Sequence, residues 1–128
     1  MRKSDKRPPT AIGHVVLRVR DVARSVRFYR TLGLRKIMER KQLAILELRG
    51  GTHLLLFPTT REIREKRIRN FDLMVDDVPR CHRDLARLKL RVTDIQEEPM
   101  GGHLWFETFD PDGRALGVYS THTEGRAV

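Results

Sequence analysis

IGHVVLRVRDV at residues 12–22 and IRNFDLMVDDV at residues 68–78 have the same rhythm of apolar and polar residues. In the first stretch every second residue is aliphatic, namely Val15, Leu17 and Val19. This period of two predicts a strand with one face on a core. The two stretches differ at the position of His14, where the second has Asn70.

The order of elements after each stretch also repeats. Asp21 and Asp77 each precede a run with helical spacing of apolar residues, and either aspartate can cap a helix. These two aspartates are 77 − 21 = 56 residues apart, as are His14 and Asn70. Further strands are predicted at 43–48, 53–57, 104–109 and 115–120. An internal duplication is the simplest explanation.

The repeat divides the chain into two similar units within one structural domain. We expect an α+β fold of two tandem βαβββ units. The connection is charged and compatible with a short helix. The predicted segments are a flexible basic tail (1–10), the first unit (11–57), the connection (58–69), the second unit (70–122) and a tail (123–128).

Composition limits the partners. The chain has a net charge of +9, but the charge is scattered and only 6% of residues are aromatic, which disfavours nucleic acid. No apolar run has the roughly 20 residues of a membrane span. The basic start does not look like a secretory signal, and one cysteine fits a reducing compartment, so we expect a cytoplasmic protein.

Two motifs carry a resemblance to a known family. The segment RDVARSVRFYRTLGLR at 20–35 and the segment FETFDPDGRALGVYS at 106–120 are similar to the vicinal oxygen chelate superfamily. That superfamily includes glyoxalase I, extradiol dioxygenases, fosfomycin-resistance thiol transferases and bleomycin-resistance proteins. The resemblance covers about residues 11–120. It implies that the paired βαβββ units form a cupped, half-open mixed sheet with its helices outside, but it does not select one reaction.

The resemblance also implies where a divalent metal binds in the enzymatic members. Carried over by position, the four ligand places are His14, Leu55, Asn70 and Gly117. Only His14 is a good ligand, and a catalytic metal normally has three protein ligands. We therefore expect a degraded metal site and no cofactor, with a divalent metal as the less favoured alternative. His14 itself is then a remnant ligand or an ordinary cleft-lining histidine.

Strand alternation predicts which side chains share the cleft with His14. Asp72 and Glu107 are carboxylates on this face, and inward carboxylates need partners. They either form ion pairs with Arg18 or join His14 as a catalytic or shifted metal-binding set. The other expected ligand-binding residues of the cleft are Arg18, His53, Phe57, Asn70, Met74, His103, Trp105 and Tyr119.

Two classes of function remain open at this point. The departures at the ligand positions favour a metal-independent protein that binds a small organic molecule, as bleomycin-resistance proteins do. The alternative is a glyoxalase-like lyase or dioxygenase-like oxygenase that uses a non-standard site around His14, Asp72 and Glu107. In both cases the resemblance implies a homodimer with the cleft near the contact.

Overall fold

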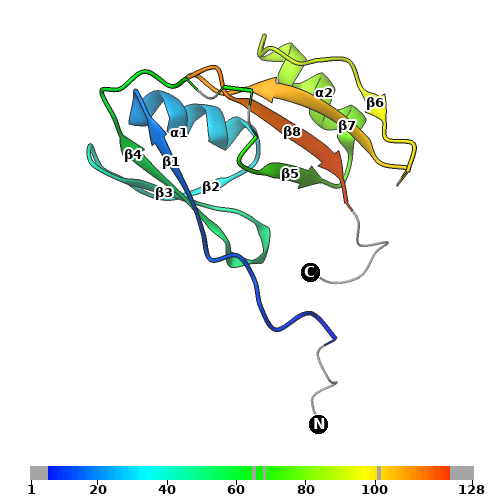
Figure 1. Ribbon diagram of the computed structural model, residues 1–128, viewed down its shortest axis with the longest axis horizontal. Coiled ribbons are helices and arrows are strands. Elements are labelled where there is room, and N and C mark those ends of the chain that lie inside the picture. The colour runs from blue at the N-terminus through cyan, green and yellow to red at the C-terminus, as the bar shows by residue number, and fades with distance from the viewer. Residues whose placement is uncertain (1–5, 65, 68, 101, 122–128) are drawn as a thin grey trace.

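The structure is a computed structural model that describes residues 6–64, 66–67, 69–100 and 102–121. Two similar halves lie side by side (Figure 1). The first half consists of β1 (His14–Val19), α1 (Val22–Thr31), β2 (Arg35–Glu39), β3 (Ala44–Glu47), the short 3-10 turn η1 (Arg49–Gly51) and β4 (His53–Pro58). The second half consists of β5 (Asp72–Val75), α2 (Val78–Arg87), β6 (Gln96–Glu97), β7 (Leu104–Phe109) and β8 (Ala115–Ser120).

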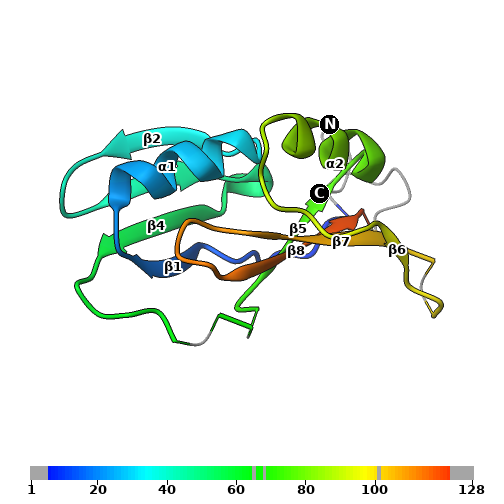
Figure 2. The same ribbon diagram turned by 90° about the horizontal axis from the view of Figure 1, so that it is seen from above.

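Each half folds as one βαβββ unit. The strands form two four-stranded sheets with the equivalent orders β1-β4-β3-β2 and β5-β8-β7-β6. In each sheet the first strand along the chain pairs in parallel with the last one along the chain, β1 with β4 and β5 with β8. The remaining pairs are antiparallel. Both helices lie on the same side of the two sheets (Figure 2). The predicted α+β class and the duplication are therefore confirmed.

The two helices begin and end at equivalent residues. Asp21 caps α1 by accepting a hydrogen bond from the Arg24 amide at 3.0 Å, and Asp77 accepts one from the Arg80 amide at 3.0 Å. Gly33, with φ of 101°, follows the end of α1. Such a left-handed residue is typical of a helix terminus. α2 begins and ends 56 residues after α1, which is the offset that the comparison of the two halves of the sequence predicts.

The strand alternation places the core between the sheets and the helices. Alternate strand residues point to the helix side and are buried, as Leu17, Leu54, Leu73, Phe106 and Val118 are. The helices contribute their own apolar stripes to the same layer, including Val26 and Leu85. This burial agrees with the alternation that predicts one strand face on a core, and it leaves the other face of each sheet without a helix. We call that face the open face.

A buried polar network joins the two units. The Asp110 carboxylate, which begins the Asp-Pro-Asp-Gly turn, accepts hydrogen bonds from the Tyr29 hydroxyl at 3.1 Å and from the Arg114 guanidinium at 3.0 Å. Arg114 also donates to the backbone carbonyl of Arg18 in the first unit. Burial and the neighbouring Asp110 raise the pKa of Tyr29 well above its ordinary value. The two motifs that carry the family resemblance thus contact each other.

Three details differ from or add to the sequence-based expectation. The edge strands β2 and β6 were not located by pattern, because their residues are almost all exposed and show no alternation. The connection at 58–69 contains no helix in its described residues, although its composition is compatible with a short one. None of the helices in the described part of the chain is long and apolar enough to cross a membrane.

Candidate functional site

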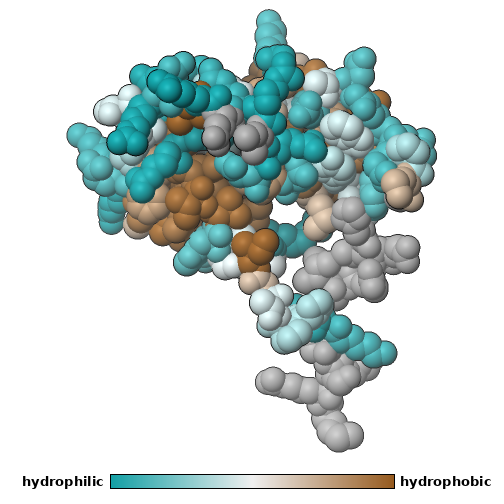
Figure 3. Space-filling view, viewed as in Figure 1, coloured by the Kyte–Doolittle hydropathy of each residue, from teal (hydrophilic) through white to brown (hydrophobic). Residues whose placement is uncertain are grey.

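The open face of the first sheet is apolar in its middle. Val16, Leu55 and Ile45 lie in one row across β1, β4 and β3, and Val16 is 52% exposed. Figure 3 shows the corresponding apolar area on the first unit, over the strands. A large exposed apolar area on a protein surface often marks a site of interaction with a ligand or another protein.

Polar side chains flank this apolar row. His14 and His53 are cross-strand neighbours whose rings lie 6.4 Å apart. The His53 imidazole lies 3.5 Å from the Glu47 carboxylate, which also pairs with Arg35. On the other side of the row, the Arg18 guanidinium lies over the Phe57 ring at 5.1 Å. Four predicted cleft residues therefore share the open face of the first sheet.

The open face of the second sheet carries a charged and aromatic cluster. Asp72, Gly117 and Glu107 form one row across β5, β8 and β7. Arg69, which precedes β5, places its Nε 3.4 Å from Asp72 Oδ1 and its Nη1 3.9 Å from Glu107 Oε2. Its Nη2 donates a hydrogen bond to the Tyr119 hydroxyl at 3.2 Å.

The Arg69 guanidinium is held from several sides at once. It lies 5.5 Å from the centre of the Trp105 ring and 5.7 Å from that of Tyr119. Burial lowers the pKa of Arg69, but the Tyr119 hydrogen bond and the Asp72 and Glu107 charges outweigh it and raise that pKa. Among the described residues, its buried Nη1 has no hydrogen-bond partner. Arg69 is therefore a permanently charged group at the centre of this face.

Gly117 lies directly under this cluster. A Cβ atom added at Gly117 would lie 2.5 Å from Asp72 Oδ1, 2.6 Å from Arg69 Nη1 and 2.8 Å from Tyr119 Cε2. Real Cβ atoms essentially never approach other atoms so closely. The arrangement of Asp72, Arg69 and Tyr119 therefore requires a residue without a side chain at position 117.

Next to this cluster lies a concave region of about 310 Å³. Its lining includes Met74, His103 and Tyr119, with the carboxylates of Asp72 and Glu98. Tyr119 stacks on Trp105 with ring centres 5.5 Å apart and planes 9° apart. A flat aromatic wall beside a hollow of this size suits a small organic molecule.

Another hollow of about 320 Å³ shares Asp72, Leu73 and Met74 with the first, so the two are contiguous. It lies where the units meet and is mostly apolar, with Val15 and Leu48 from the first unit and Phe71 from the second. Together the two hollows join the open face of the second sheet to the boundary between the units.

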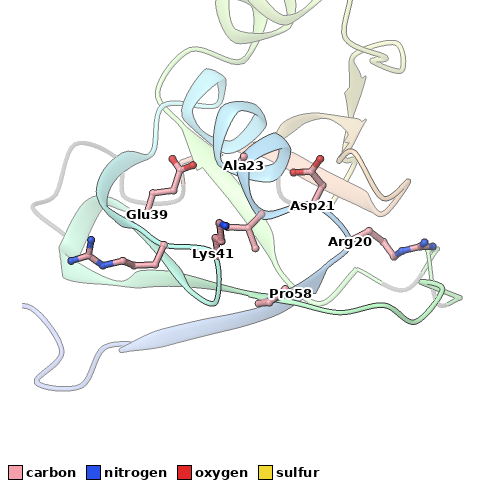
Figure 4. Close-up of a pocket in the computed structure, with 8 residues that line it drawn as sticks. Arg20, Asp21, Ala23, Glu39, Lys41 and Pro58 are labelled. Atoms are coloured by element: carbon pink, nitrogen blue, oxygen red, sulfur yellow. The ribbon is translucent and has the colours of Figure 1, made fainter.

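A third hollow, of about 490 Å³, lies elsewhere, at the start of α1 (Figure 4). Asp21, Glu39 and Lys41 are among its lining residues, and the side chain of Arg20 points away from its centre. Acidic, basic and small apolar residues line this hollow. It has no aromatic wall, and its hydrogen-bond donors do not converge on one point. We therefore place the candidate site on the second sheet.

Three of the four positions that the family resemblance assigns to metal ligands carry residues that do not fit a metal. Leu55 is a half-buried aliphatic residue, Asn70 is exposed, and Gly117 has Asp72 and Arg69 packed against it. Within the described ranges, no three His, Cys, Asp or Glu side chains are grouped so that they could hold one ion. His14 is thus not joined with Asp72 and Glu107 in one metal-binding group of a single chain.

The structure separates the predicted site residues into two groups, one on each sheet. His14, Arg18, His53 and Phe57 lie on the first sheet, and Asp72, Met74, Glu107, Trp105 and Tyr119 lie on the second, with His103 just before β7. Asn70 precedes β5 and is exposed. His103 is half-buried, with its Nδ1 3.4 Å from Ser120 Oγ.

One expected partnership was wrong, and one central residue was missed. Asp72 and Glu107 pair with Arg69, whereas Arg18 lies over Phe57. Sequence reasoning assigned Arg69 to the connection between units, because it precedes the alternating part of its strand. The available signal was the pair of carboxylates, Asp72 and Glu107, predicted on one sheet face, since such a pair requires a nearby cation.

The fold and this site define a paired βαβββ protein with an open sheet face in each unit. The profile of the Glyoxalase/Bleomycin resistance protein/Dioxygenase superfamily matches residues 11–118, and the chain belongs to this superfamily. No curated protein matches the chain.

Solved structures give the same architecture. The chain is similar to SMU.1112c, with 26% identity and a TM-score of 0.74 over 88% of this chain and 99% of that one. It is also similar to lactoylglutathione lyase from Agrobacterium tumefaciens, with 22% identity and a TM-score of 0.75 over 94% and 100%. A bleomycin resistance determinant encoded on the transposon Tn5 has 20% identity and a TM-score of 0.70 over 88% and 99%.

Proposed function

We propose that this protein binds a small organic molecule against the open face of its second sheet without the help of a metal. The observation that carries the proposal is the Trp105–Tyr119 stack beside a hollow of about 310 Å³. Stacked aromatic rings bind flat apolar groups through a large contact area with little loss of side-chain freedom. Met74, which is 50% exposed, lines the same hollow and offers a flexible apolar contact.

The departures at the ligand positions support binding without metal. Leu55 and Gly117 offer no donor atom, and the guanidinium of Arg69 lies against Gly117. A bound cation there would be repelled by Arg69, because like charges at contact distance are strongly unfavourable in a partly buried site. The protein thus has a hollow suited to a small molecule, together with residues that disfavour binding of the family's metal.

The charge of the hollow indicates which ligands to try first. The net charge of the chain is +9, yet Asp72 and Glu98 line the hollow and no Lys or Arg does so within the described residues. Asp72 is already paired with Arg69, so the side of the hollow lined by Glu98 is where a positive group is favoured. A flat aromatic molecule whose positive group lies on the Glu98 side, away from Arg69, therefore fits this lining better than an anion. His103 adds a group that can donate or accept a hydrogen bond.

Tryptophan fluorescence tests the proposal, since Trp105 is the only tryptophan of the chain. A panel of small aromatic compounds of both charge signs is titrated with and without a chelator, and the melting temperature is measured with each compound. We expect saturable quenching or a spectral shift for aromatic cations, weakened about two- to tenfold by Tyr119→Leu, the loss of one good aromatic contact. The matched control, Phe57→Leu on the first sheet, should leave the binding constant unchanged.

Two results would count against the proposal. Either no compound of the panel changes both the fluorescence and the melting temperature, or every response disappears with the chelator. The second result would favour a metal-dependent lyase or dioxygenase around His14, Asp72 and Glu107, which stays a prediction of the sequence.

A further inference from the structure

The second sheet carries two carboxylates in one cross-strand row. Asp72 and Glu107 flank Gly117 on the open face, and both are directed at Arg69, at 3.4 Å and 3.9 Å. Two carboxylates that share a partly buried space repel each other and require a compensating cation. Arg69 supplies that cation from within the chain.

The position of the guanidinium coincides with that of a lost ligand. Arg69 Nη1 lies 2.6 Å from where a Cβ at residue 117 would be, which is the start of any longer side chain there. Residue 117 is the family ligand position in the second unit. The space through which an acidic ligand would reach a metal is therefore filled by the arginine itself.

We infer that the Arg69 guanidinium is a resident cation that replaces the divalent metal of the superfamily, with Asp72 and Glu107 as its counter-charges. This goes beyond metal-independent binding, because it names the group that substitutes for the metal and the residues that keep it in place. It also explains the glycine at position 117 as a requirement of the arginine rather than a simple loss of a ligand.

The surroundings of Arg69 fix its position. The Tyr119 hydroxyl accepts a hydrogen bond from Nη2, the Trp105 ring lies at 5.5 Å, and the buried Nη1 faces Gly117. A flexible surface arginine would keep all its nitrogens in water, because an unpaired buried donor is costly. The Arg69 side chain is only 28% exposed, as a built-in structural cation requires.

This arrangement makes a specific prediction about divalent cations. Arg69→Met keeps an apolar stem against Trp105 and Tyr119 but removes the charge. It leaves Asp72 and Glu107 directed at one vacated space, and carboxylate oxygens are the ligands that Ca²⁺ and Mn²⁺ prefer. The variant should therefore gain affinity for these ions, whereas the unchanged protein should have none at this place.

Thermal unfolding of the full chain, with and without about 10 mM CaCl₂ or MnCl₂ at matched ionic strength, measures this gain. We expect the melting temperature of Arg69→Met to rise by about 5 °C with either ion, as for a ligand at roughly ten times its Kd. Arg69→Lys, which keeps a cation, should not respond. Adding Asp72→Asn to Arg69→Met should abolish the response.

The matched control is Arg49→Met. Arg49 also pairs with a carboxylate, Asp76, at 2.9 Å, but on an exposed surface outside the cluster. Its loss should produce no response to either ion. If Arg69→Met does not fold alone, circular dichroism after refolding with Ca²⁺ or Mn²⁺ provides the same readout, and recovery of the fold by the ions is expected.

Two results overturn the inference. One is that neither the stability nor the refolding of Arg69→Met depends on the ions, and the other is that the unchanged protein responds as strongly as the variant. The Trp105 fluorescence titration of the unchanged protein is a separate readout. The proposed function can therefore fail while the inference about Arg69 stands, or the reverse.

Discussion

Gly117→Ala tests the packing of the Arg69 cluster with a single methyl group. The added Cβ would lie 2.5 Å from Asp72 Oδ1 and 2.6 Å from Arg69 Nη1, where ordinary contacts are 3.4–4 Å. Both atoms would have to move by about 1 Å, and Tyr119 would also have to shift. The substitution thus perturbs the centre of the site without changing its charge.

The expected cost follows from these contacts. Overpacking of this kind costs about 1–3 kcal/mol, and the disturbed ion pair adds about 0–1 kcal/mol because it is partly exposed. The lower chain entropy of alanine offsets about 0.5–1 kcal/mol of this. We therefore expect a net loss of about 1–3 kcal/mol, or roughly 4–12 °C in melting temperature for a chain of this size.

Urea unfolding monitored by circular dichroism measures the loss, and Gly13→Ala is the matched control. A Cβ at Gly13 would have no atom within 4 Å, and this glycine has no left-handed φ. In the Arg69→Met background the cost of Gly117→Ala should fall by about 1 kcal/mol, because the two sites share a contact. Equal costs for Gly117→Ala and Gly13→Ala would refute the placement of the guanidinium over Gly117.

Other predictions concern the core, the unit junction and assembly. Leu73→Ala should cost about 2–5 kcal/mol in urea unfolding, since Leu73 is 7% exposed, whereas Met74→Ala should cost far less; the reverse order would mean that the faces are misassigned. Because the folded-state pKa of Tyr29 is raised, stability should fall as the pH rises above about 10, and Tyr29→Phe should flatten this fall in urea titrations; an unchanged slope would contradict it. Light scattering should give a homodimer, and a mass near the 15.0 kDa of one chain would contradict this.

The duplication and the core were predictable because they depend on local periodicity. Val15, Leu17 and Val19 alternate with polar residues, and Asp21 and Asp77 recur at the offset later found for the helices. These signals depend on neighbours along the chain, which a sequence displays directly. The exposed edge strands β2 and β6 lack such periodicity and were not located.

The candidate site was only partly predictable. Alternation correctly placed Asp72, Glu107, Trp105 and Tyr119 on one face, because these residues lie within strands. Arg69 lies outside the regular strand, and its contacts with Glu107 and Tyr119 join residues 38 and 50 positions apart. No local pattern encodes such contacts, so the choice between Arg18 and Arg69 as the partner required the three-dimensional structure.

Elemental analysis of the purified protein tests the central claim most directly, namely that this superfamily member has replaced its metal. After mild dialysis, we expect Zn, Ni, Mn and Fe each to be far below one equivalent per chain, and a chelator to leave the melting temperature unchanged. The reason is that Leu55 and Gly117 provide no ligand, and that the Arg69 guanidinium lies against Gly117 and would repel a cation there. A near-stoichiometric metal whose removal lowers the melting temperature would contradict the account.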